Sequence, residues 1–85
     1  MEKYKVLIKP SAAKELESIR KEALSRIVRR VLSLAKDPRP HGSEKLSGED
    51  KYRIRQGNYR IVYAIEDEAH TVTVVKVGHR GEVYR

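Results

Sequence analysis

Basic side chains recur at every second position in a short stretch near the middle of the chain. Lys51, Arg53 and Arg55 follow this spacing, and Arg60 comes a few residues later. Because successive residues of a strand point to opposite faces, the spacing predicts that the first three cations share one face of a β-strand. Arginine forks match phosphate oxygens in a bidentate way, so the chemistry indicated is the binding of a phosphate group.

The residues around these cations predict a β-hairpin. The run from Tyr52 to Ile65 reads YRIRQGNYRIVYAI, with Gly57-Asn58 between two alternating segments. Both residues tolerate the positive φ of a primed two-residue turn, which would pair Arg55 with Arg60 and Gln56 with Tyr59. The row on the opposite face, which we expect to be core, is Tyr52, Ile54, Ile61 and Tyr63.

Two arginines that face each other across a hairpin carry a cost. Directly opposed like charges destabilise a sheet by a few tenths to about 1 kcal/mol. A bound anion would remove the cost between Arg55 and Arg60. The plainer alternative is that the side chains splay into solvent or pair with carboxylates. The hairpin alone leaves both alternatives open.

The end of the chain adds a group that titrates near neutral pH and a phenol. If the last strand lies beside the second hairpin strand, it brings His79, Arg80 and Tyr84 to the same edge as the arginines. This set suits cleavage of a phosphodiester by a ribose 2′-OH, because arginines stabilise the developing charge and other groups move the protons. An aromatic ring can also stack on an unpaired base. The plainer interpretations are an exposed loop histidine and a tyrosine that covers the core.

Other kinds of site have little support in the sequence. The chain has no Cys, and its His, Asp and Glu residues lack the spacing of metal ligands, so we expect no metal and no cofactor. There is no glycine-rich phosphate loop and no nucleophile elbow. We expect Arg26, Arg29 and Arg30 to form a solvated helix face.

The elements that must position these residues follow from periodicity. We expect a strand at 4–8, helical sequence over 11–35 with Ser11 as N-cap and a break near 20–22, the hairpin, and a strand at 71–77. An apolar stripe on the second helix would contain Leu24, Ile27, Val28, Val31, Leu32 and Ala35. The expected fold class is α+β: a small, mostly antiparallel sheet in the order β-α-α-β-β-β, with two N-terminal helices packed on one face.

Length and charge bound the function. We expect residues 1–85 to be a single domain. The chain has 19 basic and 12 acidic residues, a net charge of +7, which favours a polyanion or an acidic protein as partner. No stretch is long and apolar enough to span a bilayer, so we expect no membrane association and a cytoplasmic protein.

Two segments resemble the RelE/ParE superfamily of toxins from toxin–antitoxin pairs. They are KLSGEDKYRIRQGNYRIVYAI (45–65) and VVKVGHRGEVYR (74–85), and the resemblance covers essentially the whole chain. It implies a RelE-like, microbial RNase-type fold. Members like RelE cut messenger RNA in the ribosomal A site and are neutralised by a cognate antitoxin. Members like ParE act on DNA gyrase and lack the basic catalytic set.

The resemblance also implies roles for individual residues. The basic positions of the first hairpin strand correspond to Arg53 and Arg55, and RelE itself has lysines there. Arginine does not act as a base at neutral pH, so the proton work would move to His79, Tyr84 or Lys51, with His79 preferred. The other residues carried over are Arg60, Arg80 and Tyr84, and we expect Lys51 and Lys45 to bind substrate.

These expectations lead to one hypothesis and two alternatives. The hypothesis is a toxin that acts as a ribosome-dependent, metal-independent mRNA endoribonuclease. Its partners would be a cognate antitoxin, the ribosome and mRNA. The first alternative is a ParE-like inhibitor of DNA gyrase without nuclease activity. The second is an RNA-binding module that leaves RNA intact.

Overall fold

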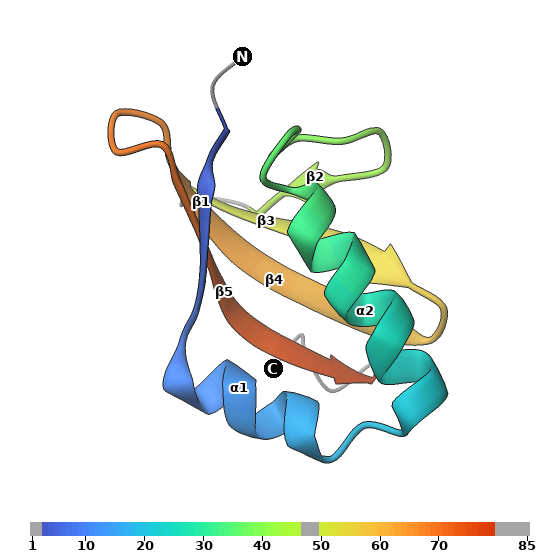
Figure 1. Cartoon of the computed structure of the whole chain (residues 1–85). Helices are drawn as coiled ribbons and strands as arrows, with labels where there is room; N and C mark the ends of the chain where they lie inside the picture. Colours follow the sequence, from blue (N-terminus) through green and yellow to red (C-terminus); the bar gives the residue numbers. More distant parts are fainter. Residues whose placement is uncertain (1–2, 47–49, 80–85) are drawn as a thin grey trace.

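A computed structural model describes residues 3–46 and 50–79 of the chain. Its elements are β1 (Lys5–Ile8), α1 (Pro10–Glu17), α2 (Lys21–Ser33), β2 (Glu44–Lys45), β3 (Lys51–Gln56), β4 (Tyr59–Glu66) and β5 (Thr71–His79). The strands form one sheet in the order β1-β5-β4-β3-β2 (Figure 1). The expected α+β class is confirmed, with the two-residue strand β2 as an addition that the sequence did not predict.

The sheet is mixed, although most of its pairs are antiparallel. β1 runs parallel to β5, with Lys5 opposite Thr71 and Ile8 opposite Val74. The β2–β3, β3–β4 and β4–β5 pairs are antiparallel. β5 therefore lies inside the sheet, between the first strand of the chain and the hairpin.

The predicted hairpin register is confirmed. Arg55 lies opposite Arg60, and Gln56 lies opposite Tyr59. In the turn, Gly57 has a φ of 61°, whereas Asn58 does not have a positive φ. Positive φ at the first central residue alone matches a type II′ turn, one of the two primed types that suit a hairpin.

The β4–β5 pairing contains a bulge. Val62 lies opposite Lys76 and Tyr63 lies opposite Val74, so Val75 is an extra residue on β5. An extra residue reverses the alternation of side chains beyond it. Side chains of β5 therefore alternate regularly before Val75 and after it, but not across it. The face on which His79 lies depends on this extra residue.

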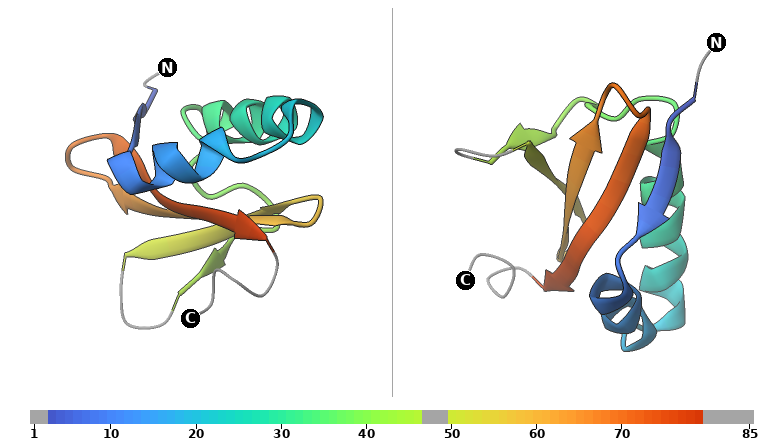
Figure 2. Two further views of the ribbon diagram at one scale, coloured as in Figure 1. Left: turned by 90° about the horizontal axis from the view of Figure 1, so that it is seen from below. Right: turned by 90° about the vertical axis from the view of Figure 1, so that its left-hand side faces the viewer.

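Both helices lie on the same side of the sheet (Figure 2). The expected break between them is confirmed, because α1 ends at Glu17 and α2 begins at Lys21. The expectation for Ser11 was wrong: Lys9 is the N-cap, Pro10 occupies the first turn and Ser11 lies inside α1. Proline suits that position, because it has no N–H to leave unpaired and its φ is already helical.

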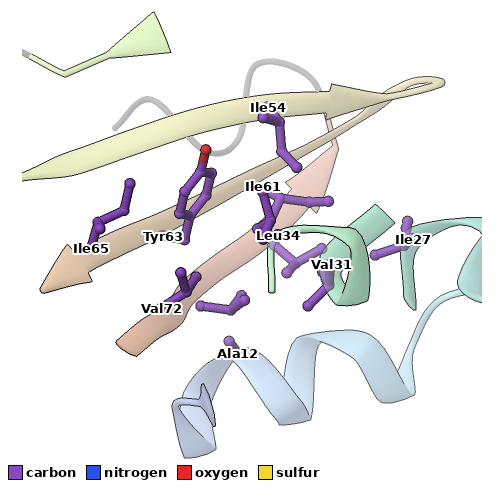
Figure 3. Packing of buried hydrophobic residues seen from close by; sticks show 11 residues of the cluster. Ala12, Ile27, Val31, Leu34, Ile54, Ile61, Tyr63, Ile65 and Val72 are labelled. Carbon is purple, nitrogen blue, oxygen red and sulfur yellow. The ribbon is translucent and has the colours of Figure 1, made fainter. Parts of the chain in front are cut away.

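The core fills the space between this side of the sheet and the helices. We call this side the helix face; Ile54, Ile61 and Tyr63 point into it and are fully buried. Figure 3 shows them meeting Ala12 from α1, and Ile27, Val31 and Leu34 from α2 and its end. The predicted helix stripe was partly wrong, because Val28 and Leu32 are 39% and 60% exposed while Leu34 is buried.

Polar contacts fasten the segment after α2 to the sheet. The buried Tyr63 hydroxyl donates to the Pro38 carbonyl at 2.7 Å, and burial raises the pKa of Tyr63 to about 12. Arg39 forms an ion pair with Asp67 at 2.8 Å, and the Tyr4 hydroxyl also donates to Asp67. These two donors, Arg39 first, lower the pKa of Asp67 to about 2.

Candidate active site

The opposite side of the sheet carries the basic row, and we call it the arginine face. By the register, Lys51, Arg53 and Arg55 of β3 share this face with Arg60 of β4. Gly78 of β5 lies opposite Arg60 and adds no side chain beside it. Among the described elements, no helix covers this face (Figure 2).

The cations of the arginine face lie at different depths. Arg55 is exposed, the side chain of Arg53 is 12% exposed, and Arg60 is only 7% exposed. Alternation placed Arg60 on the correct face but does not indicate depth, and the structure shows that Arg60 is buried. A guanidinium stays charged when it is buried, so Arg60 is a fixed positive charge on the strand next to the accessible Arg55.

Arg53 has a carboxylate partner that the sequence analysis missed. Glu44 of β2 lies opposite Arg53 and forms an ion pair with it. The Glu44 side chain remains 60% exposed. Burial, and then the nearby charge of Arg55, lower the pKa of Arg53. For Arg53 the plainer alternative therefore holds in part, since its charge is shared with a carboxylate.

The two lysines expected to bind substrate are separated by the sheet. Lys51 lies opposite Ala64 in the same row as Arg53 and Arg55. Lys45 lies opposite Tyr52, in the row of the helix face at the sheet edge. Only Lys51 is therefore placed on the arginine face.

His79 also lies away from the arginines. It pairs with Tyr59, and the two ring centroids are 4.6 Å apart. It lines a hollow with Glu15 and Ser18 of the α1 segment, so its ring is on the helix face. The expectation that His79 joins the arginine cluster was wrong, because the extra residue Val75 reverses the parity of the last part of β5.

Two of the expected site residues, Arg80 and Tyr84, lie outside the described residues. Within residues 3–46 and 50–79, no group of three or more His, Asp or Glu side chains has an arrangement that could hold a metal ion. None of the helices in the described part of the chain has the length and apolar character needed to cross a membrane.

Comparison with known proteins assigns the family. Residues 6–84 match the model of the ParE toxin of type II toxin–antitoxin systems. The chain belongs to the RelE/ParE superfamily of type II toxins. Toxin RelG of Mycobacterium tuberculosis is 30% identical over 86 residues, which span 96% of this chain and 97% of RelG. Toxin RelE of the same organism is 31% identical over 84 residues, 96% of this chain and 87% of the relative.

Solved structures of this superfamily have the same fold. The toxin–antitoxin complex RelBE2 from M. tuberculosis contains a chain that matches with a TM-score of 0.83 at 28% identity, covering 96% of this chain and 97% of that one. The isolated E. coli RelE toxin matches with a TM-score of 0.80 at 27% identity, covering 95% and 90%. The chain is thus a toxin of the RelE family with the expected RelE-like fold.

Proposed function

We propose that this toxin is a ribosome-dependent endoribonuclease that cuts messenger RNA in the A site. The observation that carries the proposal is the arginine face, where the exposed Arg55 lies opposite the buried, permanently charged Arg60. A phosphate bound at Arg55 meets two positive charges that are already in place. Such preorganised charge stabilises the extra negative charge that develops during attack on a phosphodiester.

The reaction that fits this face is transfer within the RNA itself. The ribose 2′-oxygen forms a bond to the adjacent phosphorus, and the bond to the 5′-oxygen of the next nucleotide breaks. A base takes the 2′-OH proton and an acid supplies a proton to the leaving oxygen, which gives a 2′,3′-cyclic phosphate and a 5′-OH. The arginines supply the positive charge that a metal ion would supply in other nucleases.

The proton work on this face falls to other groups than His79. Two exposed glutamates lie on the arginine face, Glu44 beside Arg53 and Glu66 at the far end of β4, and Lys51 supplies a partly exposed amine. We assign the base role to Glu44, whose carboxylate is held beside Arg53 and open to substrate. Arg80 and Tyr84 keep the roles that the resemblance implies, in charge stabilisation and in stacking on the nucleotide.

The assignment of Glu44 makes a specific prediction about pH. Glu44→Gln should lower the cleavage rate about 100-fold or more and remove the acidic limb of the pH–rate profile, because an amide cannot take up a proton. Glu66→Gln, an exposed glutamate at the far end of β4, is the control. An unchanged profile in Glu44→Gln would assign the base elsewhere.

The partners follow from the same proposal. Arg55 and the net charge of +7 suit the ribosome and mRNA, and action on the ribosome implies a cytoplasmic protein. The structural matches include toxins bound to RelB antitoxins, and we propose that a cognate antitoxin neutralises this chain. The ParE description of the matching family supports inhibition of DNA gyrase as a second candidate function.

Primer extension on a defined message tests the proposal. Purified toxin is added to stalled ribosomes and, separately, to naked RNA, while a parallel sample measures supercoiling by gyrase. We expect cuts within the A-site codon only when ribosomes are present. Loss of supercoiling without any cuts, from protein with an intact circular dichroism spectrum, would replace the nuclease by the gyrase inhibitor.

A further inference from the structure

A second basic surface lies on the helix side of the molecule. The sheet separates it from Arg55. Arg26, Arg29 and Arg30 of α2 line a hollow of about 250 Å³ together with Ser33 and Gln56. No carboxylate in the described part of the chain forms an ion pair with any of the three arginines. From the sequence alone, these three arginines are expected to form a solvated helix face.

The spacing of these arginines destabilises α2. Arg26 is three residues from Arg29 and four from Arg30, and like charges at these spacings oppose a helix by about 0.2–0.5 kcal/mol per pair. An anion held by the arginines would offset this repulsion. Their planar forks suit phosphate oxygens better than single-point cations do.

This hollow continues along the end of the hairpin. A second hollow, of about 210 Å³, shares Arg26 and Gln56 with the first and reaches Tyr59 through the Gly57-Asn58 turn. Figure 1 shows this turn beside α2, at the side of the molecule where β5 ends. The two hollows therefore share a wall rather than lying on different faces.

A third hollow, of about 290 Å³, shares Tyr59 with the second hollow. Tyr59 and His79 both line it, and their rings are in contact. The carboxylate of Glu15, also in its wall, accepts hydrogen bonds from Lys76 at 3.1 Å and from the Val77 amide at 2.8 Å. Its charge is thus largely offset and does not repel a nucleic acid there.

We infer that these three hollows form one track for single-stranded RNA, which we call the helix-side groove. Each hollow alone is smaller than the range of about 300–1,000 Å³ typical of small-molecule sites, so an extended ligand fits better than a compact one. The three arginines hold phosphates, and the Tyr59–His79 pair stacks on an unpaired base. The inference rests on the proposed function for the identity of the polymer as RNA.

Binding of a single-stranded RNA oligonucleotide of about ten residues tests the groove directly. The full-length protein and a triple variant, Arg26→Gln with Arg29→Gln and Arg30→Gln, are compared by fluorescence anisotropy over a range of salt. The variant should bind at least about tenfold more weakly, and the slope of log affinity against log salt should fall by about 2. The control with equal charge loss is Lys5→Gln with Lys9→Gln and Lys36→Gln, three exposed residues outside the groove.

The aromatic end is tested by a matched pair at one position. Tyr59→Phe keeps a ring and should bind as wild type does, whereas Tyr59→Leu keeps apolar bulk without the ring and should lose roughly 5- to 100-fold. The chain has no Trp, so Tyr59→Trp introduces a single tryptophan whose fluorescence should be quenched by the single strand but not by the matching duplex.

Any of the following binding results would overturn the inference. They are equal loss in the groove and control triple variants, equal binding by Tyr59→Phe and Tyr59→Leu, and displacement of RNA by polyglutamate of the same charge, which would mark the groove as a site for an acidic protein. Cleavage by wild type with unaltered RNA binding in the groove variants would refute the groove alone. Strong, groove-dependent RNA binding without ribosome-dependent cleavage would refute the nuclease alone.

A cross-linking experiment identifies whether messenger RNA or ribosomal RNA occupies the groove. Arg29 is replaced by the photoreactive residue p-benzoylphenylalanine, and the toxin is irradiated on ribosomes with and without messenger RNA. Primer extension then maps the cross-link. Stops in either RNA support the groove and identify its source, and stops in neither would overturn it.

Discussion

The two faces of the β3–β4 hairpin belong to the same two strands but carry side chains of opposite character. On the helix face, Ile54 and Ile61 pair with each other and are fully buried under the helices. On the arginine face, Arg55 and Arg60 pair at the next position along the same strands. The first pair gains stability from burial, whereas the second loses stability by like-charge repulsion. The contrast supports the proposal that the helix face stabilises the fold and the arginine face binds an anion.

The largest expected effect comes from a core residue of the helix face. Ile61→Ala should lower the free energy of unfolding by about 2–5 kcal/mol, because it removes buried methyl groups and leaves a cavity. Urea denaturation followed by circular dichroism measures this. Val62→Ala is the comparison, because Val62 lies on the arginine face outside the core cluster and is only 7% exposed. A loss as large at Val62 as at Ile61 would mean that both faces stabilise the fold equally.

The next effect concerns activity rather than folding. Arg55→Gln should lower ribosome-dependent cleavage about 100-fold, the usual cost of removing one preorganised charge from a developing oxyanion. The same change should leave stability unchanged or raise it by a few tenths of a kcal/mol, because the repulsion from Arg60 is relieved. Arg20→Gln, at an exposed arginine between the helices, controls for net charge. If Arg55→Gln instead destabilises the fold at full activity, the division of tasks between the faces is wrong.

A smaller effect separates buried from exposed polar contacts. Tyr63→Phe removes the donor that reaches the buried Pro38 carbonyl, and should cost about 1–2 kcal/mol of stability. Tyr52→Phe, by contrast, removes an exposed acceptor of the Arg39 guanidinium and should cost no more than about 0.5 kcal/mol. Thermal unfolding of the two variants side by side makes the comparison. Equal shifts in Tm would show that burial of Tyr63 adds nothing to its hydrogen bond.

The smallest effect is a dependence on pH at the exposed Asp67. Its pKa is lowered to about 2 by Arg39 and then by Tyr4, so the ionised carboxylate stabilises the folded state. This contribution is complete above the ordinary pKa of an aspartate, near 4, and is lost as the pH falls from about 4 to 2. Urea midpoints at pH 7, 4 and 3 should fall less for Asp67→Asn than for wild type. Parallel curves for the two proteins would show that Asp67 does not contribute.

The alternation of the hairpin was enough to predict its register, because a period of two and a Gly57-Asn58 turn allow only one pairing that buries the isoleucines. The same argument gives the face of a residue but not its depth, so it could not show that Arg60 is buried. Glu44 was missed because a strand of two residues has no periodicity to detect.

The position of His79 shows how a single residue limits such predictions. Strict alternation from Thr71 would place His79 on the arginine face, together with Thr73 and Val77. The extra residue Val75 puts Val77 into the core and His79 beside Tyr59. Nothing in a run of β-branched residues marks where a bulge falls, so the sequence predicted the strand but not the direction of its last side chains.

The parallel pairing of β1 with β5 has a consequence for the order of folding. β3, β4 and β5 are joined by short turns, so they can assemble from contacts that are near in the chain. Joining Lys5 to Thr71 closes a loop that contains both helices and the hairpin, and the chain entropy of that closure must be overcome before the contact stabilises anything. We therefore expect the first strand of the chain to be the last to enter the sheet. Until then, the edge of β5 that pairs with β1 would stay open to pairing with another chain.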